Sequence, residues 1–306
     1  MRKVLFACFM FLNSFLSAKV VLISFDGSGH MSKWKDTLEF SEKNKVPFTY
    51  FISAPYFLSQ EEEKTHPYWA TKEIGPALIP FRNDKQAKTI KSRFLMLKRA
   101  IDDGCEIGTH LVGHYDGSKW TYEQWMKEFE FFQWCMSTKE FDFNGQILGV
   151  RAPYEGVNKD YFRALKDSQY QWDSSVDIKG NVSTYMGVTE VPIRAVEVFD
   201  GDYVNDVWVT APVRYKSDRV IWIQPFDCAF ISDVQPNIPP NTNMQKVFLN
   251  TLKSAYWSNA EPIQVCLHFD ATDNGMVYYN GMVDFVQWAK GQRAEFLTYS
   301  QWIGRK

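Results

Sequence analysis

The sequence predicts an α/β protein built as a distorted (β/α)-barrel. Short β-branched and apolar runs alternate with amphipathic stretches of helix length along most of the chain. Such alternation is typical of parallel strands that are connected by helices, and short strands in this number suit a barrel. The 306 residues, 45% of them apolar and 23% charged, are enough for one large domain with a sizeable core.

The first 18 residues have the layout of a secretory signal peptide. Two basic residues precede an apolar run over 4–16, and two small residues follow it. The run is shorter than the roughly 18 to 20 residues of a membrane span. We therefore expect a signal peptide at 1–18, an exported protein without a stable membrane anchor, and one domain over 19–306. A retained anchor or a buried N-terminal helix is the alternative.

The predicted elements of the domain follow from hydrophobic patterning. Seven runs have strand character: 19–25, 47–53, 106–111, 147–151, 220–225, 263–269 and 295–299. Six amphipathic stretches read as helices: 32–45, 85–103, 122–137, 159–168, 244–257 and 283–290. Two segments break the alternation. The segment 54–84, with four prolines and several aromatics, predicts an ordered loop over the barrel mouth, and 194–219 predicts an insertion or an extra hairpin.

The charge and cysteine content limit which partners and which cysteine chemistry the protein can have. A formal net charge of -2, with both signs spread along the chain, gives no electrostatic footprint for nucleic acid or anionic lipid. No obligate protein partner is inferred. The cysteines after the signal segment have no Cys-x-x-Cys spacing, so we expect buried free thiols rather than a redox or zinc motif: Cys105, Cys135, Cys228 and Cys266.

Five short motifs place chemically active side chains at or near the ends of predicted strands. Each alone has an ordinary structural reading, such as a turn, a core histidine or a surface arginine. The carboxyl ends of barrel strands converge on one cavity, so the five together predict a site. Its candidates are Asp26, His110 with His114, Arg151, Asp173 and His268.

The two histidines form the most metal-like feature. His110 and His114 are four residues apart after a short strand, and a helical turn or a loop would let both imidazoles meet one metal. The zinc protease pattern requires a Glu directly after the first His. Leu111 occupies that position, which excludes this enzyme class.

The combined motifs resemble the polysaccharide deacetylases that share the NodB homology domain, carbohydrate esterase family four. The resemblance covers essentially the whole mature chain in the right order. SFDGS at 24–28 corresponds to the family's TFDDG motif, and His110 with His114 corresponds to its His-x-x-x-His motif. RAPY at 151–154 matches Arg-x-Pro-Tyr, and WDSS at 172–175 resembles the YDSS form of the fourth motif. Leu267 with His268 matches the Leu-His motif. The resemblance implies a NodB-type distorted (β/α)-barrel and a metal-dependent hydrolase that removes N-acetyl groups from amino sugars of a polysaccharide.

The resemblance also implies a role for each acid–base residue. Asp26 would be the general base for the attacking water, and Arg151 would pair with Asp26 and keep it ionised. His268 would protonate the leaving amine as general acid, while Asp173 would orient and charge-stabilise His268.

Three further residues would meet the substrate. The backbone N–H of Tyr154 would help to stabilise the oxyanion, and Trp172 and Leu267 would contact the substrate, with Leu267 lining the pocket for the acetyl methyl group.

The implied cofactor is a divalent metal, with Zn²⁺ expected, held by His110 and His114. One departure affects this site, because the family's usual third ligand is the second Asp of TFDDG and this chain has Gly27 there. The candidates for the third position are Ser28, His30, Asp116, Asp26 or extra waters.

The expected substrate is the N-acetylglucosamine of peptidoglycan, in the periplasm or outside the cell. The alternatives are a chitin oligosaccharide deacetylase and a non-catalytic pseudoenzyme that binds glycans through aromatic side chains such as Trp69, Trp120 and Trp172. The chain retains the base Asp26, the acid His268 and their predicted partners Arg151 and Asp173. This retention favours an enzyme over a glycan-binding pseudoenzyme.

Overall fold

The computed structural model describes residues 18–27, 29–79, 81, 87–137, 146–175, 183–201, 203–204, 207–208, 212–214, 220–258, 261–269 and 276–306. Nearly all of the predicted signal peptide, Ser28 and parts of both irregular segments lie outside this set. Within it, no helix is both long and apolar enough to cross a bilayer.

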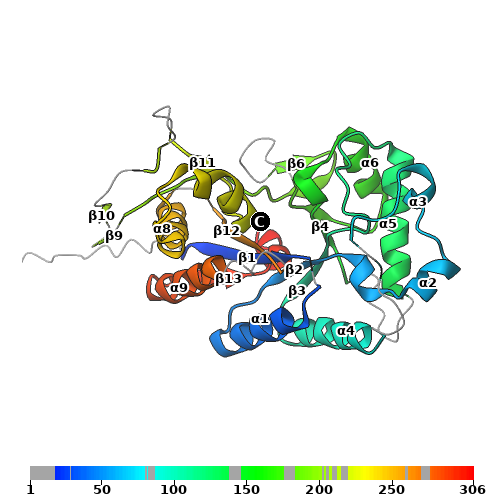
Figure 1. The fold of residues 1–306 in the computed structure, drawn as a ribbon, viewed down its shortest axis with the longest axis horizontal. Coiled ribbons are helices and arrows are strands. Elements are labelled where there is room, and N and C mark those ends of the chain that lie inside the picture. The colour runs from blue at the N-terminus through cyan, green and yellow to red at the C-terminus, as the bar shows by residue number, and fades with distance from the viewer. Residues whose placement is uncertain are drawn as a thin grey trace, which may run out of the picture.

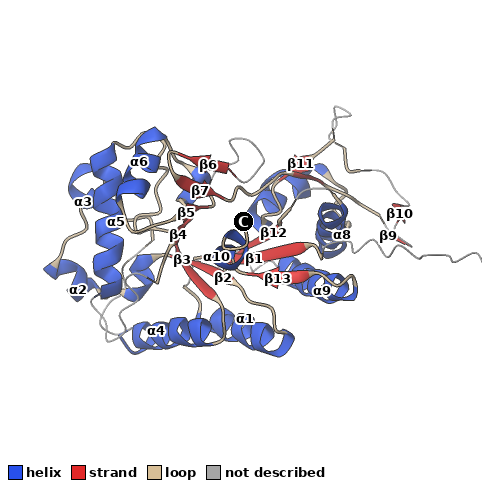
Figure 2. Ribbon diagram, turned by 180° about the vertical axis from the view of Figure 1, so that it is seen from behind, coloured by secondary structure: helices blue, strands red, loops and turns tan. Residues whose placement is uncertain are grey.

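A nine-stranded curled sheet forms the centre of the molecule (Figure 2). Its strand order is β12-β1-β2-β3-β4-β5-β7-β6, and β13 also pairs with β1. All neighbours are parallel except β6 and β7. The strands are β1 Val20–Asp26, β2 Thr49–Ile52, β3 Glu106–Thr109, β4 Gly149–Val150, β5 Trp172–Asp173, β6 Ser183–Tyr185, β7 Val188–Glu190, β12 Ile263–His268 and β13 Glu295–Leu297.

Helices surround this sheet (Figure 1), which confirms the predicted distorted (β/α)-barrel. The longer ones are α1 Met31–Asn44, α4 Ala87–Asp102, α5 Tyr122–Ser137, α6 Lys159–Asp167, α8 Met244–Trp257 and α9 Val277–Gly291. All six match predicted stretches, although α9 begins six residues before its predicted start at 283. In α6, Tyr161, Phe162 and Leu165 form the buried face, and the side chain of Asn158 caps the N-terminus.

Strand β1 is buried along its whole length because the core covers both of its faces. Val21, Ile23 and Phe25 belong to the large core cluster, while Val20 and Leu22 belong to a smaller cluster on the other face. This alternation follows from the two-residue period of a strand. A chain segment of this kind is held rigidly, and so is the residue at its end, Asp26.

The segment 54–84 is ordered where it is described, as predicted. It contains three short helices, η1 Ala54–Phe57, α2 Gln60–Thr65 and α3 Ala70–Glu73. A capping box at Ser59 and Glu62 starts α2. These helices pack beside α5 at one end of the molecule (Figure 1).

The run 220–225 contains a strand, as predicted, but this strand is not part of the main sheet. The two-residue strand β11 Trp222–Ile223 pairs antiparallel with β8 Val196–Glu197. The predicted hairpin in 194–219 is present as β9 Tyr203–Val204 and β10 Val207–Trp208. Conversely, β5, β6 and β7 belong to the main sheet without having been predicted as strands, because runs of two or three residues are too short to show a period.

The remaining short elements complete the chain: η3 Pro153–Glu155, α7 Asp227–Ala229, η4 Phe230–Val234, η5 Gln235–Asn237 and α10 Tyr299–Ile303. All four cysteines after the signal segment are free. Three are buried as predicted, but Cys228 is exposed because it lies in α7 at the surface.

Candidate active site

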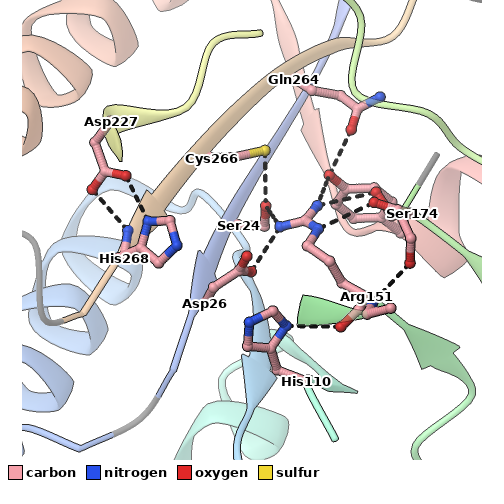
Figure 3. Close-up of polar contacts among 12 residues, drawn as sticks. Ser24, Asp26, His110, Arg151, Ser174, Asp227, Gln264, Cys266 and His268 are labelled. Atoms are coloured by element: carbon pink, nitrogen blue, oxygen red, sulfur yellow. Dashed lines mark hydrogen bonds and ion pairs between the residues drawn. The ribbon is translucent and has the colours of Figure 1, made fainter. Parts of the chain in front are cut away.

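The parallel register brings the predicted residues to one edge of the sheet. Asp26 and His268 are direct partners at the carboxyl ends of β1 and β12. Thr109 of β3, one residue before His110, pairs with Val150 of β4, one residue before Arg151. Figure 3 shows Asp26, His110, Arg151 and His268 around this common edge. The convergence expected from parallel strand ends therefore occurs.

Asp26 and Arg151 form a buried ion pair. The Nη1 of Arg151 lies 2.8 Å from a carboxylate oxygen of Asp26, and the two side chains are 1% and 2% exposed. Burial alone would raise the pKa of Asp26, but the charges of Arg151, His110 and His268 and the hydrogen bond from Arg151 together outweigh it and lower that pKa. Asp26 is therefore ionised at neutral pH.

Arg151 is fixed by further acceptors around its guanidinium group (Figure 3). It donates to the Ser24 hydroxyl at 2.9 Å, to the carbonyl and hydroxyl oxygens of Ser174 at 3.3 and 3.0 Å, and to the Tyr299 hydroxyl at 2.8 Å. These bonds satisfy the buried cation on several sides and hold it against Asp26.

His268 is paired with a carboxylate that the motifs did not identify, Asp227. The Nδ1 of His268 lies 2.7 Å from one Asp227 oxygen, and the backbone N–H of His268 donates to the other at 2.9 Å. Burial would lower the pKa of His268, but the hydrogen bond and charge of Asp227, together with the charge of Asp26, raise it to about 9. The imidazole is therefore protonated at neutral pH, and it is 28% exposed.

The predicted partnership of Asp173 with His268 is wrong. The carboxylate of Asp173 accepts hydrogen bonds from the Tyr161 hydroxyl at 2.5 Å and from the hydroxyl and backbone N–H of Ser175 at 2.6 and 2.9 Å. The Ser175 hydroxyl in turn accepts from the backbone N–H of Ala152. Asp173 thus braces the chain next to Arg151, since the end of β5 adjoins β4 rather than β12.

A signal for Asp227 existed in the sequence. Asp227 lies two residues after the predicted strand 220–225. The other candidates are chosen because they lie at or near the ends of predicted strands, and the same criterion would have identified Asp227. A parallel bridge between Phe226 and Cys266 brings this segment alongside β12 and places Asp227 against His268.

His110 and His114 lie on a loop rather than on a helix, and their ring centroids are 5.2 Å apart. The Nδ1 of His110 lies 2.7 Å from the carbonyl oxygen of Arg151, which can only accept, so the proton is on Nδ1 and the lone pair is on Nε2. Burial lowers the pKa of His110 to about 4. A neutral, oriented imidazole is the form that a metal requires.

The adjacent rings of His110 and His114, and the neutral, oriented imidazole of His110, are compatible with a divalent metal between the two side chains. Asp26 is the less suitable ligand, because Arg151 already holds its carboxylate, and Asp26, His110 and His114 do not form a compact ligand group. In the described part of the chain, the group of potential ligand atoms within 4.8 Å of one another is Asp227, Cys228 and His268. Partial shielding of its sulfur from solvent and the charge of Asp227 raise the pKa of the Cys228 thiol to about 12, and His268 is protonated there, so a metal bound by this group would have to displace both protons.

Of the predicted substrate-contacting residues, only Tyr154 is accessible. It is 65% exposed, and its ring centroid lies 5.2 Å from that of His114. Trp172 is 1% exposed and stacks on Tyr299, and Leu267 is 0% exposed within the main core. The predictions for Trp172 and Leu267 are therefore wrong in this structure, because both side chains point into the packed interior.

Several non-glycine residues around the site have left-handed backbone conformations. Leu111 and His114 have φ values of 63° and 57°, and Tyr154 and Glu155 have values of 57° and 53°. Such conformations are uncommon outside glycine and gather at functional sites, where the surrounding structure enforces them.

The family model described as polysaccharide deacetylase matches residues 15–172, which is just over half of the chain. The chain therefore belongs to the polysaccharide deacetylase family. No curated protein sequence matches it significantly.

Two solved structures of carbohydrate esterase family four, each with a TM-score of 0.50, share this fold. The carbohydrate esterase family four domain of a multidomain xylanase, from the hindgut metagenome of Trinervitermes trinervoides, is 14% identical with a TM-score of 0.50, over 94% of this chain and 91% of that one. A mutant pseudoenzyme of the same family with restored activity is 11% identical with a TM-score of 0.50, over 93% and 67%. The peptidoglycan deacetylase PdaC from Bacillus subtilis is 12% identical with a TM-score of 0.46, over 93% and 90%.

Proposed function

We propose that this protein is an active N-deacetylase that removes acetyl groups from the amino sugars of a polysaccharide, with the N-acetylglucosamine of peptidoglycan as its substrate. The observation that carries the proposal is the pairing of an ionised Asp26 with a protonated His268 on adjacent strands. Amide hydrolysis needs a base for the attacking water and an acid for the leaving nitrogen. Two groups held in opposite protonation states at one site meet both needs.

In this proposal Asp26 accepts the proton of the attacking water, and Arg151 keeps Asp26 ionised and correctly placed. His268 delivers its proton to the leaving amine nitrogen. Asp227 is a positioning residue, because its hydrogen bond to Nδ1 leaves the other nitrogen, Nε2, to donate towards the substrate.

His110 and His114 would hold the divalent metal. A metal in that position supplies Lewis acidity, which polarises the acetyl carbonyl and makes the attacking water more acidic. The pair is supported by the neutral state of His110 and by the contact of Nδ1 with the Arg151 carbonyl. With Gly27 in place of a third protein ligand, we expect a weaker metal site than in deacetylases with the full motif.

Tyr154 would support the oxyanion through its backbone N–H. Its backbone is left-handed, and its exposed ring lies beside that of His114. Export through the segment 1–18 and action on a wall glycan complete the proposal, and mass spectrometry of the protein from its native host should find a mature N-terminus near Lys19.

The decisive experiment measures acetate release from purified peptidoglycan and from chitin oligosaccharides, before and after chelation and metal restoration. We expect release from peptidoglycan that chelation abolishes and Zn²⁺ restores. Release from chitin oligosaccharides alone would reassign the substrate. No release from either glycan, with glycan binding retained, would replace the proposal with the pseudoenzyme.

A further inference from the structure

The spacing of His110 and His114 does not by itself bring their imidazoles together. On a helix, residues four apart share a face, but these two lie on an irregular loop whose Leu111 and His114 are left-handed. The position of His114 relative to His110 therefore depends on whatever fixes the backbone between them.

That backbone is fixed by hydrogen bonds from four consecutive N–H groups. The N–H of His110 donates to the Ile52 carbonyl at 2.8 Å, and that of Leu111 donates to the Thr109 hydroxyl at 2.9 Å. The next two, of Val112 and Gly113, donate at 2.9 and 2.8 Å to one carboxylate oxygen of Glu128 in α5.

The second oxygen of Glu128 binds the segment that covers the loop. It accepts from the Tyr68 hydroxyl at 2.8 Å and from the indole N–H of Trp69 at 2.9 Å. Glu128 is 0% exposed, so bulk water does not compete with these four donors for its carboxylate. The fit over Gly113 is close, since an added Cβ there would lie 2.1 Å from the Tyr68 hydroxyl oxygen.

We propose that Glu128 is a positioning residue for the metal site: its carboxylate clamps the His110–His114 loop between α5 and the segment 54–79, and so sets the affinity for the metal. The inference rests on the proposed function of the two histidines as metal ligands. Glu128 itself touches no reacting group.

The arrangement requires a group that accepts hydrogen bonds at both oxygens, which only a carboxylate provides. In Glu128→Gln, the amide NH₂ must face one of the two donor pairs. Backbone N–H groups and the indole N–H cannot accept, whereas a hydroxyl can rotate and do so. Gln therefore fits best with its NH₂ towards Tyr68 and Trp69. Even so, this NH₂ faces the indole N–H of Trp69, so two donors face each other without an acceptor between them.

The test measures the affinity of the purified full-length protein for Zn²⁺ by competition with a chromophoric chelator, with Co²⁺ absorption spectra to report the ligand geometry. We expect Glu128→Gln to weaken Zn²⁺ binding by about tenfold, the low end of what loss of a ligand-supporting contact costs. Thermal melts establish that the metal-free variant is folded.

A rescue separates positioning from a general loss of packing. In Glu128→Gln with Trp69→Phe, the opposing indole N–H is gone and the Tyr68 hydroxyl can accept from the amide. We expect this double variant to bind Zn²⁺ more tightly than Glu128→Gln alone. The matched control is Glu63→Gln, because Glu63 accepts from the Tyr68 backbone N–H and does not contact the loop. It should bind Zn²⁺ like the unaltered protein.

The outcomes distinguish this inference from the function on which it rests. If the unaltered protein binds no Zn²⁺, the proposed metal site is wrong. If it binds Zn²⁺ and Glu128→Gln binds equally tightly with the same Co²⁺ spectrum, the clamp is wrong while the metal site stands. An equal loss in Glu63→Gln would also overturn the clamp.

Discussion

Replacing Asp227 by Asn should remove the proposed acid function of His268. Asp227 accepts at both oxygens, from Nδ1 and from the backbone N–H of His268. An Asn side chain has one acceptor, so one of these bonds must be lost, and the negative charge is lost in either case. Burial still disfavours the protonated imidazole, and the remaining charge of Asp26 opposes burial only in part.

The size of the effect follows from the pKa. The difference between the ordinary value of 6.5 and about 9 corresponds to about 3 kcal/mol in favour of protonated His268. Because the pKa is raised, the protonated form is populated below about pH 9 and is lost as the pH rises through that value. If the pKa falls to 6.5 or lower, about one quarter or less of His268 is protonated at pH 7.

Two measurements check this prediction. NMR titration of the His268 ring in the metal-free protein should give a pKa near 9 in the unaltered protein and at or below 6.5 in Asp227→Asn. The alkaline limb of the kcat/KM profile should move to lower pH in the same direction. A variant that keeps a His268 pKa near 9 would refute the reasoning that Asp227 sets the protonation state.

The remaining predictions concern the other groups at the site. Asp26→Asn and His268→Ala should each lower kcat/KM by about a hundred- to ten-thousand-fold in acetate-release assays while the thermal melts show a folded protein. Asp173→Asn should lower the free energy of unfolding by about 1 to 3 kcal/mol in denaturant titrations, because a buried acceptor is weakened, and should leave the His268 pKa unchanged; a shifted pKa would restore the original role of Asp173. Gly27→Asp should tighten Zn²⁺ binding in chelator competition. It should also lower the stability of the fold by about 1 kcal/mol, because φ at this position is 86°. An unchanged Zn²⁺ affinity would show that this position does not face the metal.

The sequence alone was sufficient for the architecture and for much of the site. The alternation of apolar runs and amphipathic stretches predicted the curled α/β fold and its six longer helices, because burial patterns of long elements are local and periodic. The rule that parallel strands deliver their ends to one edge predicted the meeting of Asp26, His110, Arg151 and His268. The motifs then identified the family that the comparison confirms.

The tertiary structure decided which groups touch. Asp173 lies in one of the five motifs and Asp227 follows an apolar run, but only the strand order shows that β5 adjoins β4 while the segment before Asp227 lies along β12. The accessibility of Trp172 and Leu267 likewise depends on which face the core covers. No sequence motif indicates the role of Glu128, because that role depends on the donors of Tyr68 and Trp69, which lie more than fifty residues away in the chain. Periodicity is encoded locally, whereas a hydrogen-bond partner is set by the spatial order of elements far apart in the chain.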